Sequence, residues 1–151
     1  MNGDNQTRPV RILVVDDNAE AAESLKEFLE EVGYEVAAAT QASAALTTAR
    51  TFLPEVAILD IKLGAIDGYE LGQHLHAIRE LRNCALIAAT GYSHDATADR
   101  SRQAGFEYHL VKPIDLTRLQ HILHELSARL RGAPPNSANS QRPPSDPAPR
   151  S

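Results

Sequence analysis

Short runs of mainly apolar residues alternate along this chain with longer segments whose apolar residues recur at helical spacing. Because the runs are continuous rather than alternating with polar residues, they predict strands that are buried on both faces. The repeated order of strand and helix predicts an α/β fold, (βα)5, with a doubly wound parallel sheet. The predicted strands are Ile12–Val15, Val36–Ala39, Val56–Leu59, Leu86–Ala89 and Tyr108–Val111. Helical spacing is clearest at Leu25, Phe28, Leu29 and Val32, at Leu71, Leu75 and Ile78, and at Leu116, Leu119, Leu123, Leu126 and Leu130.

Single residues mark where several of these helices begin and end. Gly33 and Gly105 each follow a helical segment, where a glycine in the left-handed conformation commonly ends a helix. Asp115, two residues after Pro113, is placed to cap the last helix. The segment 94–104 contains alanine but no large apolar residue. We therefore expect it to be weakly held on the sheet and to move in response to a chemical change.

Polar residues follow four of the five predicted strands, and they suggest a common site. Asp16 and Asp17, Asp60, Thr90 and Lys112 each come directly after an apolar run. In an open parallel sheet, ligands bind beyond the carboxyl ends of the strands. Three carboxylates favour a small hard cation such as Mg²⁺, with Mn²⁺ as an alternative. The cation, Lys112 and Thr90 would stabilise a phosphoryl group, and Asp60 would be the nucleophile.

Each of these residues has a simpler explanation when it is taken alone. An acidic pair after a strand commonly caps the next helix, a threonine can belong to a turn, and a lysine can be a solvated charge. Four strand-end positions that all suit phosphoryl chemistry would rarely coincide, so the combination favours the functional interpretation.

Composition limits the class of protein. The chain has 151 residues, of which 42% are hydrophobic and 23% charged, enough for one domain and too few for two. The net charge of −5 disfavours binding to nucleic acid. The single cysteine, Cys84, begins an apolar run and is expected to be buried, with a cytosolic location. We expect no signal peptide and no membrane span, because no apolar stretch is long enough.

The two ends of the chain differ in composition from the rest. We expect residues 1–9 to be a flexible N-terminus, residues 10–131 to form the domain, and residues 132–151 to be a disordered tail rich in proline and serine. The last twenty residues carry a net charge of +1, from Arg142, Arg150 and Asp146, so the remainder carries −6. The tail would act as a solubilising terminus, or else as a tether or docking segment.

Over about Arg11 to Leu130 the chain resembles the receiver domains of two-component response regulators. The resemblance is carried by five motifs at matching positions. They are Val14-Val15-Asp16-Asp17, Ile58-Leu59-Asp60, Asp67-Gly68, Ala89-Thr90-Gly91 and Leu110-Val111-Lys112-Pro113. The last motif, and the segment leading to it from Ala104, also resemble receivers attached to hybrid histidine kinases.

The resemblance implies a flavodoxin-like fold with strand order 2-1-3-4-5 and a specific set of site residues. Asp17, Asp60 and the backbone carbonyl of Lys62 would bind Mg²⁺ directly, and Asp16 would bind it through water. Asp60 would accept a phosphoryl group from a sensor histidine kinase or a histidine phosphotransfer protein, with Lys112 and Thr90 assisting. Such a protein is a signalling protein that catalyses only its own phosphorylation and dephosphorylation. The Lys112–Pro113 bond is expected to be cis.

The resemblance also implies how the signal would leave the domain. Thr90 would move toward the phosphoryl group, and the surface formed by the segment 94–104, the last strand and the last helix would repack. That surface would bind a downstream protein target, or a second copy of the chain in a homodimer formed on phosphorylation.

The sequence departs from the family at three places near the site. Most receivers have Met-Pro three and four residues after the phosphoacceptor, where this chain has Leu63-Gly64, so we expect a freer loop. His109 occupies the position of the usual aromatic switch residue, and a histidine there would add sensitivity to pH. Lys62 and Tyr92 could screen the acyl phosphate from water and so tune its lifetime.

Several functions stay open at this stage. A stand-alone phosphoreceiver that signals by protein contact fits, and so does a phosphorelay intermediate or a phosphate sink for a hybrid kinase. A pseudo-receiver adaptor that works without phosphorylation fits less well, because no acidic residue and no lysine is lost. An aspartyl phosphatase would need an acid where Lys62 stands. A flavodoxin would place its flavin phosphate against the acidic pair, which would repel it.

Overall fold

The computed structural model describes residues 8–91 and 104–131, which fall into two compact units. Residues 9–115 form the first unit, and Arg8 with residues 116–131 belongs to the second. The flexible termini expected at residues 1–9 and 132–151 lie almost entirely outside the described residues, as does most of the segment 94–104.

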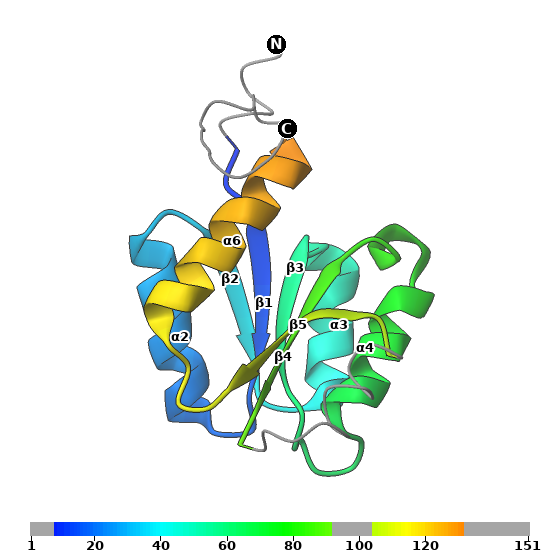
Figure 1. Ribbon diagram of the computed structural model, residues 1–151. Helices are drawn as coiled ribbons and strands as arrows, with labels where there is room; N and C mark the ends of the chain where they lie inside the picture. The colour runs from blue at the N-terminus through cyan, green and yellow to red at the C-terminus, as the bar shows by residue number, and fades with distance from the viewer. Residues whose placement is uncertain (1–7, 92–103, 132–151) are drawn as a thin grey trace. The chain divides into compact units, whose positions relative to one another are not determined.

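The first unit is built on a parallel sheet of five strands in the order β2-β1-β3-β4-β5 (Figure 1). This order confirms the predicted flavodoxin-like fold. Every predicted strand is present, and several begin one or two residues before the predicted start. The strands are β1 (Arg11–Val15), β2 (Glu35–Ala39), β3 (Val56–Asp60), β4 (Ala85–Thr90) and β5 (Phe106–Val111).

Burial explains why the central strands contain so few polar residues. All residues of β3 and β4 are buried, because helices cover both faces of a doubly wound sheet. The edge strands carry exposed residues, such as Glu35 on β2 and Glu107 on β5. The only polar residues in β3 and β4 are Asp60 and Thr90, and each is the last residue of its strand. Their position in an apolar context indicates a function other than packing.

Three helices of the first unit cover the two faces of the sheet. The helix α2 (Ala19–Glu31) lies on one face, and α3 (Ala42–Phe52) with α4 (Gly68–Ala77) lies on the other (Figure 1). The core on the α3 and α4 side is a single cluster that joins alternate sheet residues, such as Leu13, Leu59 and Leu86, to residues of the two helices.

Side chains fix the start of two of these helices. Asn18 caps α2 by accepting a hydrogen bond from the Ala21 amide, and Asp67 caps α4 through a reciprocal pair of bonds with Glu70. The helix α4 ends at Ala77, and Ile78, the last residue of the predicted apolar spacing, is its C-cap residue. Ile78 is extended, and the short 3-10 helix η1 (Arg79–Leu81) follows it.

Backbone geometry and burial agree with several local predictions. Gly33, just after α2, has a φ of 108°, in the left-handed region that suits glycine. Gly105 has a φ of 90°, and the helix expected before it lies outside the described residues. The Lys112–Pro113 peptide bond is cis. Cys84 is buried, with 6% of its surface exposed.

The second unit contains the helix α6 (Leu116–Arg131), which begins directly after Asp115. Its buried residues, Leu119, Ile122, Leu123 and Leu126, recur at helical spacing on one side. The Arg131 Nε atom donates a hydrogen bond to the Arg8 carbonyl at 3.2 Å. No helix within residues 8–91 and 104–131 is long and apolar enough to span a membrane.

Candidate functional site

The residues predicted from the strand ends meet at one edge of the sheet. Asp60 and Thr90 end β3 and β4, Asp16 and Asp17 follow β1, and Lys112 follows β5. The register aligns these ends, because Val15 pairs with Leu59, Asp60 with Ala89, and Thr90 with Val111. The strand order places β1 and β3 beside each other in the middle of the sheet, so the acidic residues of both lie together.

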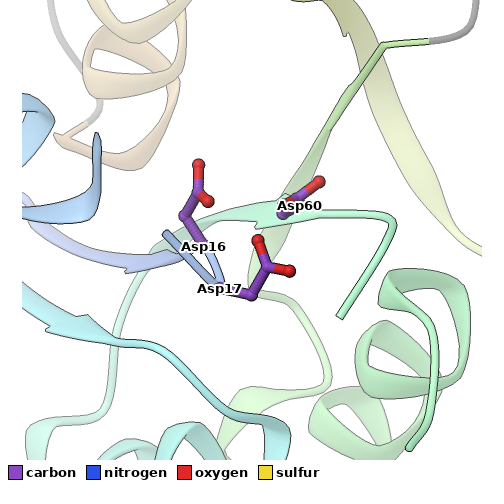
Figure 2. Close-up of side chains that lie close together, drawn as sticks. All are labelled: Asp16, Asp17 and Asp60. Atoms are coloured by element: carbon purple, nitrogen blue, oxygen red, sulfur yellow. The ribbon is translucent and has the colours of Figure 1, made fainter. Parts of the chain in front are cut away.

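The three carboxylates form a compact acidic group (Figure 2). One oxygen atom from each of Asp16, Asp17 and Asp60 lies within 4.8 Å of the others. Asp60 and Asp16 are 6% and 9% exposed, whereas Asp17 is exposed to solvent. The group therefore has a buried side, formed by the sheet, and an open side from which an ion or a phosphoryl group can approach.

Lys112 lies against the two buried carboxylates. Its Nζ atom donates a hydrogen bond to Asp16 Oδ2 at 3.0 Å and lies 3.3 Å from Asp60 Oδ2. Burial raises the pKa of Asp60, and the nearby charge of Asp16 raises it further, while the charge of Lys112 opposes the shift. Burial lowers the pKa of Lys112, but the bond to Asp16 and the charges of Asp60 and Asp16 outweigh it, so that pKa is raised. The ammonium therefore stays charged at neutral pH.

The two members of the acidic pair have different surroundings. Both oxygens of Asp16 accept hydrogen bonds from the protein, from Lys112 and from the Asn18 amide, the latter at 2.9 Å. Asp17 makes no hydrogen bond or ion pair within the part of the chain that the structure describes. Asp17 is thus the carboxylate with the most unused capacity to bind a ligand.

The backbone after Asp60 is held from two directions. The Ile61 amide donates to the Ala89 carbonyl of β4 at 3.1 Å, and the Ile61 carbonyl accepts from the Gly68 amide of α4 at 2.8 Å. The Lys62 amide donates to Asp60 Oδ1 at 3.3 Å. In the loop between Ile61 and Gly68, Gly64 has a φ of 101°, a conformation that a proline at this position could not adopt.

Thr90 and His109 share one face of the sheet on neighbouring strands. Ala88 pairs with His109 and Thr90 with Val111, so the Thr90 and His109 side chains are diagonal neighbours. Thr90 is 2% exposed, and its carbonyl accepts a hydrogen bond from the Lys112 amide at 2.7 Å. His109 Nε2 is buried and has no hydrogen-bond partner among the described residues, and burial lowers the pKa of this side chain.

The donor set fits a divalent cation of the Mg²⁺ type. Three carboxylates and one ammonium leave two negative charges in a space where the carboxylates repel one another. Hard oxygen ligands on an open, solvent-facing side are what Mg²⁺ prefers, because it retains several waters. The carboxylates of Asp17 and Asp60 are the protein ligands best placed to hold such an ion.

Tyr92 lies outside the described residues, and the Lys62 side chain is exposed.

Sequence reasoning gave no role to Asn18 and no mechanism for Gly68, although both contact the site through their amides. A signal was present for Asn18, since it is a typical helix-capping residue directly after Asp17.

Comparison with known proteins identifies the family. The response regulator receiver domain model matches residues 12–124. The chain therefore belongs to the receiver domains of two-component response regulators, which are signalling proteins that accept phosphoryl groups from histidine kinases and typically bind Mg²⁺.

Relatives of similar length support this assignment. The polar-differentiation response regulator DivK of Brucella anthropi is 31% identical over 110 residues, which are 73% of this chain and 89% of DivK. A CheY-like receiver domain protein from Methanospirillum hungatei is 31% identical, with a TM-score of 0.73 over 82% of this chain and 98% of that one. A putative response regulator from Chloroflexus aurantiacus is 29% identical, with a TM-score of 0.74 over 81% of this chain and all of that one.

Proposed function

We propose that this protein is a phosphoreceiver whose phosphoacceptor is Asp60. The observation that carries this proposal is the contact of Lys112 with both Asp60 and Asp16, beside a third carboxylate at the same edge of the sheet. A carboxylate in this setting is open to solvent on one side and next to a cation that can stabilise the oxygens of a transferred phosphoryl group.

In the proposed reaction an Asp60 oxygen attacks the phosphorus atom of a phosphohistidine on a sensor kinase or a phosphotransfer protein. The new O–P bond gives an acyl phosphate, and the electron pair of the breaking P–N bond returns to the imidazole. Asp17, Asp60 and the Lys62 carbonyl would hold Mg²⁺, which when bound neutralises charge on the phosphoryl oxygens. Lys112 provides a fixed cation, and Asp16, whose oxygens are both engaged by the protein, holds Lys112 in place.

Thr90 and His109 are the residues we propose for the conformational response. The Thr90 hydroxyl is placed at the end of β4 to bond a phosphoryl oxygen, and His109 is its diagonal neighbour on β5. Because the buried Nε2 of His109 has no hydrogen-bond partner among the described residues, the ring loses no hydrogen bond at Nε2 when it changes position in response to Thr90. If His109→Ala left the affinity of the phosphorylated protein for its partner unchanged, this role would be wrong.

The output is proposed to be contact with a downstream protein, or with a second copy of the chain, through the surface that includes β5 and the segments on either side of it. Lys62, next to the site and exposed, would screen the acyl phosphate from water and so slow its hydrolysis. A Lys62→Ala variant should then lose its phosphoryl group at a different rate from the wild type, and equal rates would remove this role.

The test of the whole proposal is intact mass over time in the presence of acetyl phosphate, with and without Mg²⁺. We expect a gain of one phosphoryl group that requires Mg²⁺ and is absent in Asp60→Asn. Slow decay would favour an adaptor, and fast decay would favour a relay intermediate or a phosphate sink. A gain that persists in Asp60→Asn would contradict the assignment of the phosphoacceptor.

A further inference from the structure

The first residue of α4, Gly68, lies in direct contact with the backbone of the phosphoacceptor. A Cβ atom built on Gly68 would overlap the Asp60 carbonyl oxygen, and it would lie 2.8 Å from Ile61 Cα and 2.9 Å from Ile61 Cδ1. Two of these three atoms are backbone, so they cannot move away by a change of rotamer. Any side chain at position 68 must therefore push the start of α4 and the end of β3 apart.

The same contact closes the loop that carries the proposed metal ligand. The Gly68 amide donates a hydrogen bond to the Ile61 carbonyl at 2.8 Å, and the Ile61 amide is bonded to Ala89 on β4. The two bonds fix the peptide groups on either side of Ile61. Lys62, whose carbonyl is the proposed ligand, is the next residue, and its amide is bonded to Asp60 Oδ1.

Apolar side chains hold part of this loop, because Leu63 is buried in the core cluster and Ile66 packs against it. No proline lies between Ile61 and Gly68 to stiffen the backbone. Gly64 has a φ of 101°, in the left-handed region that favours glycine. The loop ends instead at the Asp67 cap, where Asp67 Oδ1 accepts from the Glu70 amide at 2.9 Å and Glu70 Oε1 accepts from the Asp67 amide at 3.3 Å. At its Asp60–Lys62 end, the position of the loop backbone therefore depends on how closely α4 approaches the end of β3.

We infer that Gly68 is a positioning residue of the metal site, because its lack of a side chain lets α4 hold the Asp60–Lys62 backbone in the geometry that binds Mg²⁺. Metal ligands must be placed to within about 0.5 Å, and loss of a supporting contact typically weakens metal affinity by about 10- to 100-fold. The inference rests on the proposed function, since it concerns the same metal site.

The chain offers a matched control in the same helix. Gly72 is also buried, and a Cβ on it would lie 2.8 Å and 2.9 Å from Phe106 ring atoms and 3.0 Å from Leu86 Cδ1. These atoms all belong to side chains of the core. Gly68→Ala and Gly72→Ala thus make the same chemical change and both overpack buried space, but only the first displaces the backbone of the phosphoacceptor.

The experiment is calorimetric titration of the full-length chain with MgCl₂, in parallel with urea unfolding of each variant without metal. We expect Gly68→Ala to bind Mg²⁺ about tenfold more weakly than the wild type, and Gly72→Ala to stay within about twofold, even where both unfold more readily. Equal Mg²⁺ affinity of Gly68→Ala and the wild type would overturn the inference and leave Gly68 with a structural role only.

A milder pair of variants keeps the test valid if Gly68→Ala does not fold. Glu70→Ala removes an exposed side chain that accepts a hydrogen bond from the Asp67 amide. Its control is Gln73→Ala, which changes an exposed residue of the same helix that has no part in the cap. We expect a two- to threefold weaker Mg²⁺ affinity, as an order-of-magnitude estimate, for Glu70→Ala alone. Unchanged affinity in Glu70→Ala would count against the inference. If the wild type and Asp60→Asn bound Mg²⁺ equally, the proposed metal site itself would be wrong.

Discussion

Lys112 and Asp16, which are 96 residues apart in the chain, form an ion pair with 3.0 Å between Nζ and Oδ2. The same ammonium lies 3.3 Å from Asp60. One cation thus connects the end of β5 to the ends of β1 and β3, at the edge of the sheet where the acidic residues meet. This connection has consequences for stability as well as for phosphorylation.

Replacement of Lys112 with methionine should destabilise the protein at neutral pH. The variant leaves Asp16 and Asp60 without their cation, and we expect the free energy of unfolding at pH 8 to fall by about 1 kcal/mol, a value reduced for the partial exposure of the pair. Because the pKa of Lys112 is raised in the folded state, its contribution is complete below the ordinary value of 10.5 and is lost as the pH rises through the raised value. Urea unfolding at pH 8 and pH 11 tests this. A difference between wild type and variant that is the same at both pH values would contradict it.

Asp60→Asn should have the opposite effect when no divalent metal is present. Burial raises the pKa of Asp60, so its ionised form costs stability above that pKa, and the cost disappears as the pH falls through it. We expect the variant to be about 1 kcal/mol more stable than the wild type at pH 7 in EDTA. Addition of Mg²⁺ should stabilise the wild type more than the variant and so reduce the difference. If Asp60→Asn were less stable than the wild type in EDTA, the interactions of the Asp60 carboxylate would outweigh the cost of burying it, and the prediction would be wrong.

Arg11 should be a determinant of stability that has no effect on the site. Its Nε donates to the carbonyls of Phe52 and Leu53 at 3.1 Å and 2.9 Å, and so satisfies the last carbonyls of α3. We expect Arg11→Ala to lower the free energy of unfolding by about 1–2 kcal/mol, since these partly buried carbonyls lose their donor. Mg²⁺ affinity should stay at the wild-type value, because Arg11 is at the opposite end of β1 from Asp16. Urea unfolding and Mg²⁺ titration of the same variant separate the two effects.

The sheet and the acidic edge could be predicted because each depends on a strong local pattern. Val56–Leu59 and Leu86–Ala89 are continuous apolar runs, and a strand buried on both faces permits little else. The strand-end positions of Asp60 and Thr90 then follow from the strands themselves. Pairing of Lys112 with Asp16 was not predicted from the strand-end pattern, because it depends on the order of strands across the sheet.

Close approach of backbone to backbone was the part that sequence reasoning missed. Asp67-Gly68 was part of the resemblance to the family, yet nothing in the sequence showed that the glycine touches Asp60. Likewise, the loop of Leu63-Gly64 was expected to be free, and its glycine does adopt a positive φ. The hydrogen bond from the Gly68 amide to the Ile61 carbonyl nevertheless closes this loop. This bond forms only when α4 packs against the end of β3, so the sequence did not indicate it.

His109 should make the protein less stable as the pH falls. Burial lowers the pKa of His109 below its ordinary value of 6.5, so the unfolded chain takes up a proton more readily than the folded one. Stability is therefore lost as the pH falls from 6.5 through the lowered pKa. The His109→Phe variant, which also removes the unpaired Nε2, should lose less stability between pH 7.5 and pH 5. Parallel losses in wild type and variant, measured by urea unfolding, would show that His109 is not the group responsible.

Cys84 should be chemically inert in the folded protein. Burial raises the pKa of its thiol to about 12, and the charges of Glu55 and Glu107 contribute to the shift. Because the thiolate is the reactive form and the side chain is only 6% exposed, iodoacetamide at pH 8 should modify Cys84 only when the protein opens. Mass spectrometry should detect almost no alkylation of the native protein and complete alkylation in urea. Mg²⁺, by stabilising the folded state, should slow any alkylation of the wild type and not of Asp60→Asn. Rapid alkylation without denaturant would mean that the packing around the start of β4 opens far more readily than its burial indicates.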